Sequence, residues 1–309
     1  MTHQTRAVIQ VSSIRKTYGK LVAVEDVSFD VKDGEIFGLI GPNGAGKTTT
    51  MECVEGIRRP SSGEITVLGL DPVRDVYALQ ERIGVQLQQA QLQKRIKVWE
   101  AAHFWASLYK KPVAVGDQLL EQLGLAEKRN AWFMTLSGGQ KQRLFIALAL
   151  INDPEVVFLD ELTTGLDPQA RRMIWDLVRG IRERGKTVFL TTHLMEEAER
   201  LCDRVAIIEH GRIIDIDKPQ RLVDKYCPER TVILTTADAD ADASLKRIPG
   251  VSAVIRQDTR YTIRGLGDRL ITDVIRCLSE NHITVTDFRT ETPNLEDVFL
   301  KLTGHSLRD

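Results

Sequence analysis

Apolar and polar residues alternate along the first part of the chain. Between residues 8 and 37, apolar side chains recur at every second or third position, as in Val22, Val24, Val27, Phe29 and Val31. Alternation of this kind is typical of strands that bury one face. The pattern predicts strands of a sheet that precede the main core, with Tyr18 on a turn among them.

From residue 36 onward the pattern changes to short apolar runs separated by helical stretches. Residues 36–40, 156–159 and 187–190 are such runs and indicate buried strands. Strands alternating with helices predict a parallel sheet covered on both faces, with ligands gathered beyond the carboxyl ends of the strands. Residues 92 to about 150 interrupt this alternation with helices, and they predict a helical insert.

The pattern changes again after Pro219 and Pro228. It predicts, in order, a strand over 231–235, a helix over 243–248, strands over 251–256 and 261–264, a helix over 268–281 and a strand over 284–289. This β-α-β-β-α-β order matches the split unit of ferredoxin-like folds. We therefore expect two domains, residues 1–225 and a small C-terminal accessory α+β domain over 226–309.

The composition indicates a globular protein without a strong charge preference. The 309 residues include 42 Lys and Arg against 43 Asp and Glu, so no overall field favours nucleic acid or anionic lipid. No apolar stretch approaches the roughly 20 residues that span a bilayer, and the N-terminus lacks a signal-peptide core. Any membrane function would need another chain. The four cysteines have no metal-like spacing and fit reduced thiols.

Two glycine-rich loops can each hold a phosphate. The first follows the apolar run 36–40 and opens a helix, so its backbone N–H groups and the helix dipole face an anion; it consists of Gly41, Pro42, Asn43, Gly44, Ala45, Gly46, Lys47 and Thr48. The second has no lysine and starts a helix with Ser137 as its N-cap; it consists of Leu136, Ser137, Gly138, Gly139 and Gln140. Since one nucleotide has little use for two complete cradles, two copies of the chain facing each other would use both.

Acidic and hydroxyl side chains follow the other two apolar runs. Asp160 and Glu161 follow 156–159, and Thr191, Thr192 and His193 follow 187–190. With these residues, the two loops and the run Gly165-Leu166-Asp167-Pro168, the chain resembles the ATP-binding subunit of an ABC (ATP-binding cassette) transporter across residues 8 to 220. The motifs stand in that family's order, and the five-residue loop at Ser137 is the most family-specific of them.

The resemblance implies a fold and an assembly. The fold is α/β, a P-loop nucleoside triphosphatase with a mostly parallel sheet, N-terminal antiparallel strands and the helical insert, followed by the ferredoxin-like domain. The activity is ATP hydrolysis with Mg²⁺. The partners are a second copy, forming a homodimer around two ATP molecules, and a separate transmembrane permease, with no nucleic acid. The location is peripheral, at the cytoplasmic face of the membrane.

Each motif then has an expected contact, because phosphoryl transfer to water depends on positioning and charge neutralisation. Lys47 holds the β- and γ-phosphates, and Thr48 and Asp160 bind Mg²⁺, an ion that takes oxygen ligands. Glu161 is the general base for the attacking water. His193 donates to the γ-phosphate. Backbone N–H groups come from Gly44, Ala45, Gly46 and Thr49.

Three further contacts rest on the resemblance. Tyr18 stacks on adenine, with an ordinary turn tyrosine as the alternative. Gln88 is the glutamine that touches Mg²⁺ and responds to the membrane partner, with Gln89 as its rival. The residues Ser137, Gly138, Gly139 and Gln140 contact the ATP held by the opposite subunit. The aromatic residues of the insert lie near the family's permease-docking surface, although the insert's own core explains most of them.

Two features bear on the type of transporter. Residues 294–304 resemble the terminal segment of drug-exporter ATPases, which favours export of a drug, lipid or other small molecule. Leu162 stands where the family usually has proline, and this change removes a φ restraint without removing a ligand. The alternative functions are a soluble ABC ATPase that acts on ribosomes or DNA, and a module that binds ATP without turnover. Intact Glu161 and His193 count against the latter.

Overall fold

The chain forms two compact units, Met1–Pro219 and Gln220–Asp309. The computed structural model describes residues 6–86, 91–238, 241–267 and 269–304. The sequence placed the boundary after Lys225, whereas most of helix α8 (Pro219–Tyr226) falls in the second unit. There Lys301 of α11 (Leu295–Thr303) donates a hydrogen bond of 2.7 Å to the carbonyl of Tyr226, which ties α8 to the C-terminal helix.

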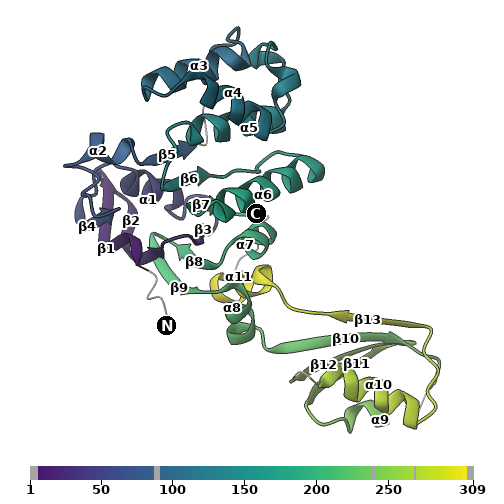
Figure 1. Cartoon of the computed structure of the whole chain (residues 1–309). Coiled ribbons are helices and arrows are strands. Elements are labelled where there is room, and N and C mark those ends of the chain that lie inside the picture. Colours follow the sequence, from purple (N-terminus) through teal and green to yellow (C-terminus); the bar gives the residue numbers. More distant parts are fainter. Residues whose placement is uncertain (1–5, 87–90, 239–240, 268, 305–309) are drawn as a thin grey trace. The chain divides into compact units, whose positions relative to one another are not determined.

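A sheet runs through the first unit in the order β4-β1-β2-β9-β8-β3-β7-β6-β5 (Figure 1). Its strands are β1 (Ala7–Tyr18), β2 (Leu21–Lys32), β3 (Ile36–Ile40), β4 (Ser62–Val67), β5 (Ile83–Gln86), β6 (Val156–Asp160), β7 (Thr187–Thr192), β8 (Arg204–Glu209) and β9 (Arg212–Asp217). Strands β3, β6 and β7 are buried along their whole length and pair in parallel, as their apolar runs predict. Strands β1, β2 and β4 pair antiparallel. The predicted α/β class and the antiparallel N-terminal strands are confirmed.

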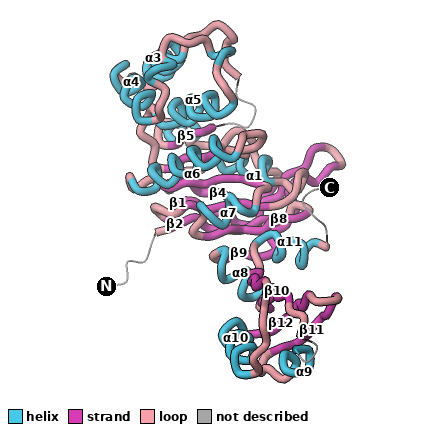
Figure 2. Tube along the Cα trace, turned by 90° about the vertical axis from the view of Figure 1, so that its right-hand side faces the viewer, coloured by secondary structure: helices cyan, strands magenta, loops and turns pink. Residues whose placement is uncertain are grey.

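Helices surround this sheet and form the insert. They are α1 (Lys47–Val54), α2 (Val76–Gln80), α3 (Val98–Leu108), α4 (Val113–Gln122), α5 (Gly138–Leu150), α6 (Pro168–Glu183) and α7 (Met195–Leu201). Short 3-10 turns lie at Ala126–Lys128 and Phe133–Thr135. Figure 1 and Figure 2 both show α3, α4 and α5 stacked together beyond β5. These helices bury a core of their own, which confirms the insert.

Phenylalanine side chains pack at the centre of the first unit. The ring centroids of Phe29 and Phe37 are 5.3 Å apart, and Phe189 lies 5.8 Å from Phe37 and 5.8 Å from Phe158. These rings join β2, β3, β7 and β6 in one apolar core, and such aromatic pairs add to the stabilisation from burial. The core therefore holds β7 between β3 and β6.

The register of the central strands determines which residues meet at their carboxyl ends. Ile40 of β3 pairs with Thr192 of β7, and Asp160 of β6 pairs with Thr191. Parallel strands in this register end at the same level, so the residues that follow them emerge side by side. The first glycine-rich loop, Glu161 and His193 are those residues.

The second unit has the predicted β-α-β-β-α-β order. Its elements are β10 (Glu229–Thr235), α9 (Ala241–Lys246), β11 (Val251–Gln257), β12 (Arg260–Leu266), α10 (Leu270–Glu280) and β13 (Asp287–Glu291), followed by α11. The strands lie in the order β11-β12-β10-β13, and each neighbouring pair is antiparallel. This arrangement confirms the ferredoxin-like prediction. Both helices pack on an apolar cluster that includes Val232, Tyr261 and Val274.

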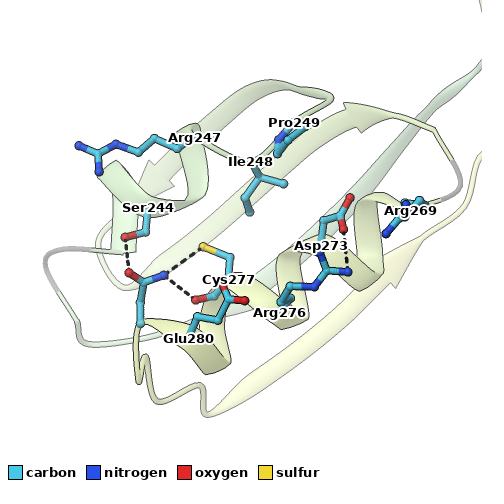
Figure 3. A pocket seen from close by; sticks show the side chains of 10 residues that line it. Ser244, Arg247, Ile248, Pro249, Arg269, Asp273, Arg276, Cys277 and Glu280 are labelled. Carbon is cyan, nitrogen blue, oxygen red and sulfur yellow. Dashed lines mark hydrogen bonds and ion pairs between the residues drawn. The ribbon is translucent and has the colours of Figure 1, made fainter.

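Helices α9 and α10 border a groove of about 600 Å³ on one face of this small sheet (Figure 3). Arg276 forms an ion pair of 3.4 Å with Asp273. The Arg247 side chain points away from this ion pair (Figure 3). The charged groups of this groove therefore do not converge on one point. Among the helices in the described ranges, none combines the length and the apolar character that a bilayer span requires.

Candidate active site

The first glycine-rich loop adopts a conformation that requires glycine. Gly44 and Gly46 have φ angles of 81° and 101°, which side-chain-bearing residues rarely adopt. A Cβ atom on Gly46 would lie 2.5 Å from the carbonyl oxygen of Ala23 on β2, while one on Gly44 would meet nothing within 4 Å. The loop is thus packed against the sheet at Gly46 and open at Gly44. Because α1 begins directly afterwards, the open side faces the N-terminus of a helix, a favourable place for an anion.

Lys47 is buried within this loop. Its side chain is 4% exposed, and its Nζ atom donates to the carbonyl oxygens of Gly41 at 2.9 Å and Pro42 at 3.0 Å. The Nζ atom also lies 3.8 Å from Oε1 of Glu161. Burial lowers the pKa of Lys47, while the carboxylates of Glu161 and Asp160 act in the opposite direction. The two carbonyl groups that accept from this ammonium are neutral. A phosphate bound beside it would be an anionic hydrogen-bond partner.

Oxygen atoms of three elements meet at Asp160. The Thr48 hydroxyl on α1 donates to its Oδ2 atom at 3.2 Å, and the Thr191 hydroxyl on β7 donates to its Oδ1 atom. Burial raises the pKa of Asp160, and the hydrogen bonds from Thr191 and Thr48 oppose that rise. A hydroxyl and a carboxylate in contact offer the hard oxygen ligands that Mg²⁺ takes, so these residues fit the predicted ion. Within the described residues, no cluster of three or more His, Cys, Asp or Glu forms a separate metal site.

Glu161 and His193 lie together at the ends of adjacent strands. Oε1 of Glu161 is 3.4 Å from Nδ1 of His193, and the two side chains are 9% and 24% exposed. The Glu161 backbone N–H donates to the carbonyl oxygen of Thr191 at 3.1 Å, and its φ of 46° is unusual for a residue with a side chain. Strained backbone of this kind is common at functional sites. The geometry thus places a carboxylate beside Lys47 and an imidazole beside that carboxylate.

The second glycine-rich loop lies elsewhere on the first unit. The Ser137 hydroxyl accepts from the backbone N–H of Gln140 at 3.3 Å, which confirms the predicted N-cap of α5. Together with residues at the start of α6, this loop lines a groove of about 190 Å³ that contains no residue of the first loop; its lining is Ser137, Gly139, Gln140, Arg143, Asp167, Gln169, Ala170 and Met173. Within one chain, the groove thus belongs to a different part of the surface from Lys47.

The glycines of the second loop lie close to the segment that starts α6. A Cβ atom on Gly138 would lie 3.2 Å from the side chain of Leu166, and one on Gly139 would lie 3.0 Å from that of Ala170. The Asp167 carboxylate caps α6 by accepting from the N–H groups of Gln169 and Ala170. The loop backbone is therefore held against the start of α6.

Tyr18 and Gln88 are the remaining residues with a role predicted from the sequence. Tyr18 is the last residue of β1, beside the turn at 19–20; the residue is 39% exposed, and Lys16 and Arg58 lie over its ring. It is thus available for stacking. Gln88, together with its rival Gln89, lies outside the described residues, and the described strand β5 ends at Gln86. The roles predicted for Tyr18 and Gln88 remain predictions.

Glu55, a buried carboxyl at the C-terminal end of α1, has no role predicted from the sequence. It is 2% exposed, and its Oε1 atom has no hydrogen-bond partner. Burial, with the nearby Asp160 and Glu52, raises its pKa to about 8. No pattern in the sequence distinguishes Glu55 from an exposed acid. Glu55 is neutral over much of the range in which an ordinary glutamate is ionised.

Replacing Glu55 by glutamine is expected to flatten the pH dependence of stability. The stability that protonated Glu55 contributes is complete below pH 4.5 and falls as pH rises, because the unfolded chain ionises first, until about pH 8. At about 1.4 kcal/mol per pKa unit, this loss amounts to a few kcal/mol. Thermal unfolding at pH about 5 and about 8.5 measures it. Glu55→Gln should be the more stable protein at the higher pH, and identical pH profiles would contradict the buried, uncompensated carboxyl.

The profile of the ABC transporter family matches residues 24–164. The chain is 39% identical over 310 residues to the Nod factor export ATP-binding protein I of Rhizobium meliloti (strain 1021), covering 97% of this chain and 89% of that protein. It is 34% identical over 314 residues to a linearmycin resistance ATP-binding protein of Bacillus subtilis (strain 168), covering 98% of this chain and 100% of that protein. Both similarities extend through the second unit.

Solved structures resemble the first unit. One is the structure of an ATP-binding subunit of an ABC transporter, with a TM-score of 0.64 and 26% identity over 71% of this chain and 93% of the other. A second is a dimeric, post-hydrolysis ATP-binding cassette bound to ADP and Pi, with a TM-score of 0.63 and 26% identity over 68% of this chain and 98% of the other.

Proposed function

The chain belongs to the ATP-binding subunits of ABC transporters, and we propose on that premise that two copies enclose two ATP molecules and power export through a separate permease. It is an ATPase of that family. The observation that carries the proposal is the meeting of Lys47, Asp160, Glu161 and His193 where β3, β7 and β6 end. These residues come from three separated segments, and the fold brings them to one place.

The first loop binds the phosphates of ATP in this proposal. Backbone N–H groups at Gly44, Ala45, Gly46 and Thr49 point to the phosphates, and Lys47 exchanges its two carbonyl partners for phosphate oxygens. Thr48, Asp160 and Gln88 hold Mg²⁺, which supplies neutralisation of the phosphate charge. The Thr48–Asp160 hydrogen bond already places two of these oxygen ligands together.

Glu161 acts as the general base on the attacking water. Its carboxylate accepts the proton, since it is largely shielded from solvent and lies at the end of the strand beside Lys47. His193 donates to the γ-phosphate, and its Nδ1 atom lies 3.4 Å from Oε1 of Glu161 without a hydrogen bond between them. Leu162 is buried, so the residue that replaces the family's usual proline is held by packing, and we expect activity to persist.

The second loop completes the site of the other copy. Its separate groove beside α6 leaves the Ser137, Gly138, Gly139 and Gln140 backbone on a surface that a second protomer can offer to ATP. The dimeric post-hydrolysis relative supports this assembly. Tyr18 stacks on adenine. Neither nucleic acid nor anionic lipid is favoured by the balanced charge.

The permease docks on the insert, and the ATPase lies at the cytoplasmic face of the membrane. Phe104 and Leu108 are four residues apart on α3 and are 52% and 59% exposed, so they form an exposed apolar surface beyond the insert core.

The relatives named for Nod factor export and linearmycin resistance favour a drug, lipid or other small molecule as cargo. Residues 226–309 form an accessory domain in this proposal.

Copurification tests the transporter assignment. The full chain is expected to copurify with an integral membrane protein, and Phe104→Glu should lose that partner while still binding ATP, because a charge is placed in an apolar contact. Ile214→Glu on β9, where the side chain is 37% exposed, is the matched control and should retain the partner. Cosedimentation with ribosomes or DNA, without a membrane partner, would instead support the soluble alternative.

A further inference from the structure

Glu197 is a buried carboxylate that none of the predicted roles uses. It lies on α7, one helical turn after His193, and is 1% exposed. Its Oε1 atom accepts two hydrogen bonds, whereas its Oε2 atom has no hydrogen-bond partner. Burying a carboxylate is costly unless its bonds compensate, so these two bonds hold the side chain in place.

The two donors come from different segments around the catalytic residues. The Thr163 hydroxyl donates at 2.8 Å from the loop that follows Glu161. The Trp175 indole N–H donates at 3.0 Å from α6. Both donors are buried, Thr163 at 0% and Trp175 at 4% exposure. One carboxylate oxygen therefore joins the loop after Glu161, the helix after His193 and the helix that packs against the second glycine-rich loop.

The contact between Glu161 and His193 depends on two loops that leave different strands. Near the strands, the Glu161 backbone bonds to Thr191. Farther out, the Thr163–Glu197 hydrogen bond is a second connection, which joins the loop after Glu161 to helix α7. The N–H groups of Glu197 and Ala198 bond to the carbonyl of Leu194, so α7 follows His193 through a hydrogen-bonded turn. A rigid turn transmits the position of Glu197 to His193.

We propose that Glu197 is a positioning residue that sets the approach of Glu161 to His193 and links it, through Trp175, to α6. The inference rests on the proposed roles of Glu161 and His193. The charge of Glu197 is not what matters, since both donors use the same oxygen and a glutamine carbonyl can accept from both. Its contribution is geometric, and small displacements of catalytic groups lower the rate of the chemical step.

Steady-state ATP hydrolysis by the full chain with MgATP tests this inference. Thr163→Val removes the hydroxyl without changing the shape of the side chain, and it should lower kcat at least about tenfold. The KM for ATP should stay within about twofold, because the first loop is untouched. Glu197→Gln should retain kcat within about threefold, and Glu197→Leu should lose as much as Thr163→Val. Glu196→Gln, an exposed neighbour paired with Arg200, is the control and should match the wild type.

A double substitution separates positioning from general destabilisation. Thr163→Val combined with Glu197→Leu should lower kcat no further than Glu197→Leu alone, because both remove the same bond. If Glu197→Leu does not fold, Thr163→Val and Glu197→Gln still carry the test. A wild-type kcat in Thr163→Val, or a raised KM in place of the lowered kcat, would overturn the inference. Failure of the proposed function would appear separately, as normal turnover in Glu161→Gln.

Discussion

Glu161→Gln is expected to lose ATP turnover by about a thousandfold while ATP stays bound. Glutamine keeps the shape and can still contact His193, but it cannot take the proton of the attacking water. Lys47 and the Thr48–Asp160 pair remain in place to hold the nucleotide. Single-turnover release of phosphate, together with retention of labelled ATP on the purified chain, measures both effects.

A matched control variant at another glutamate shows whether the loss of ATP turnover is specific to the site. Glu183→Gln changes the same chemical group at an exposed position, the last residue of α6, and it should hydrolyse ATP like the wild type. Near-normal turnover in Glu161→Gln would refute the assigned base. Loss of ATP binding along with turnover would show that Glu161 mainly supports Lys47, from which it lies 3.8 Å.

Ser137→Arg is expected to lower hydrolysis by about a hundredfold or more and to leave ATP binding by the single chain unchanged. Ser137 lies in the groove beside α6, and this groove contains no residue of the first loop. An arginine there would block the surface that a second copy would approach. Equilibrium binding of ATP to the dilute chain and steady-state hydrolysis at high protein concentration separate the two effects.

Ser137→Ala controls for the loss of the helix cap. Alanine removes the hydrogen bond to the N–H of Gln140, a change worth about 1 kcal/mol, without adding bulk. It should retain most of the hydrolysis that Ser137→Arg loses. An equal loss of ATP binding and hydrolysis in Ser137→Arg would indicate that the second loop serves the nucleotide of its own chain.

Sequence patterns predicted the parts of the site that are local. The apolar runs at β3, β6 and β7 are buried throughout, so their periodicity alone indicates strands, and the residues that follow them are candidates for chemistry. The glycines of the first loop predict a turn, and the structure has positive φ angles at Gly44 and Gly46. The accessory unit was also predictable, since its strands and helices alternate within short stretches.

Nonlocal contacts could not be read from the sequence. The order β3-β7-β6 places Glu161 against His193, and no periodicity specifies which strand lies in the middle. Glu55 and Glu197 look like ordinary surface acids on short helices until burial is known. Lys301 of α11 likewise bonds to Tyr226 of α8, 75 residues away, a pairing that composition does not encode.

The molar mass of the Glu161→Gln chain with ATP bound tests most directly whether two copies enclose the nucleotide. Light scattering should give one chain mass without ATP and twice that mass with ATP, and Ser137→Arg added to Glu161→Gln should remain at one chain mass with ATP bound. A single-chain mass for the ATP-bound Glu161→Gln variant, while the wild-type protein hydrolyses ATP as a monomer at full rate, would contradict this arrangement.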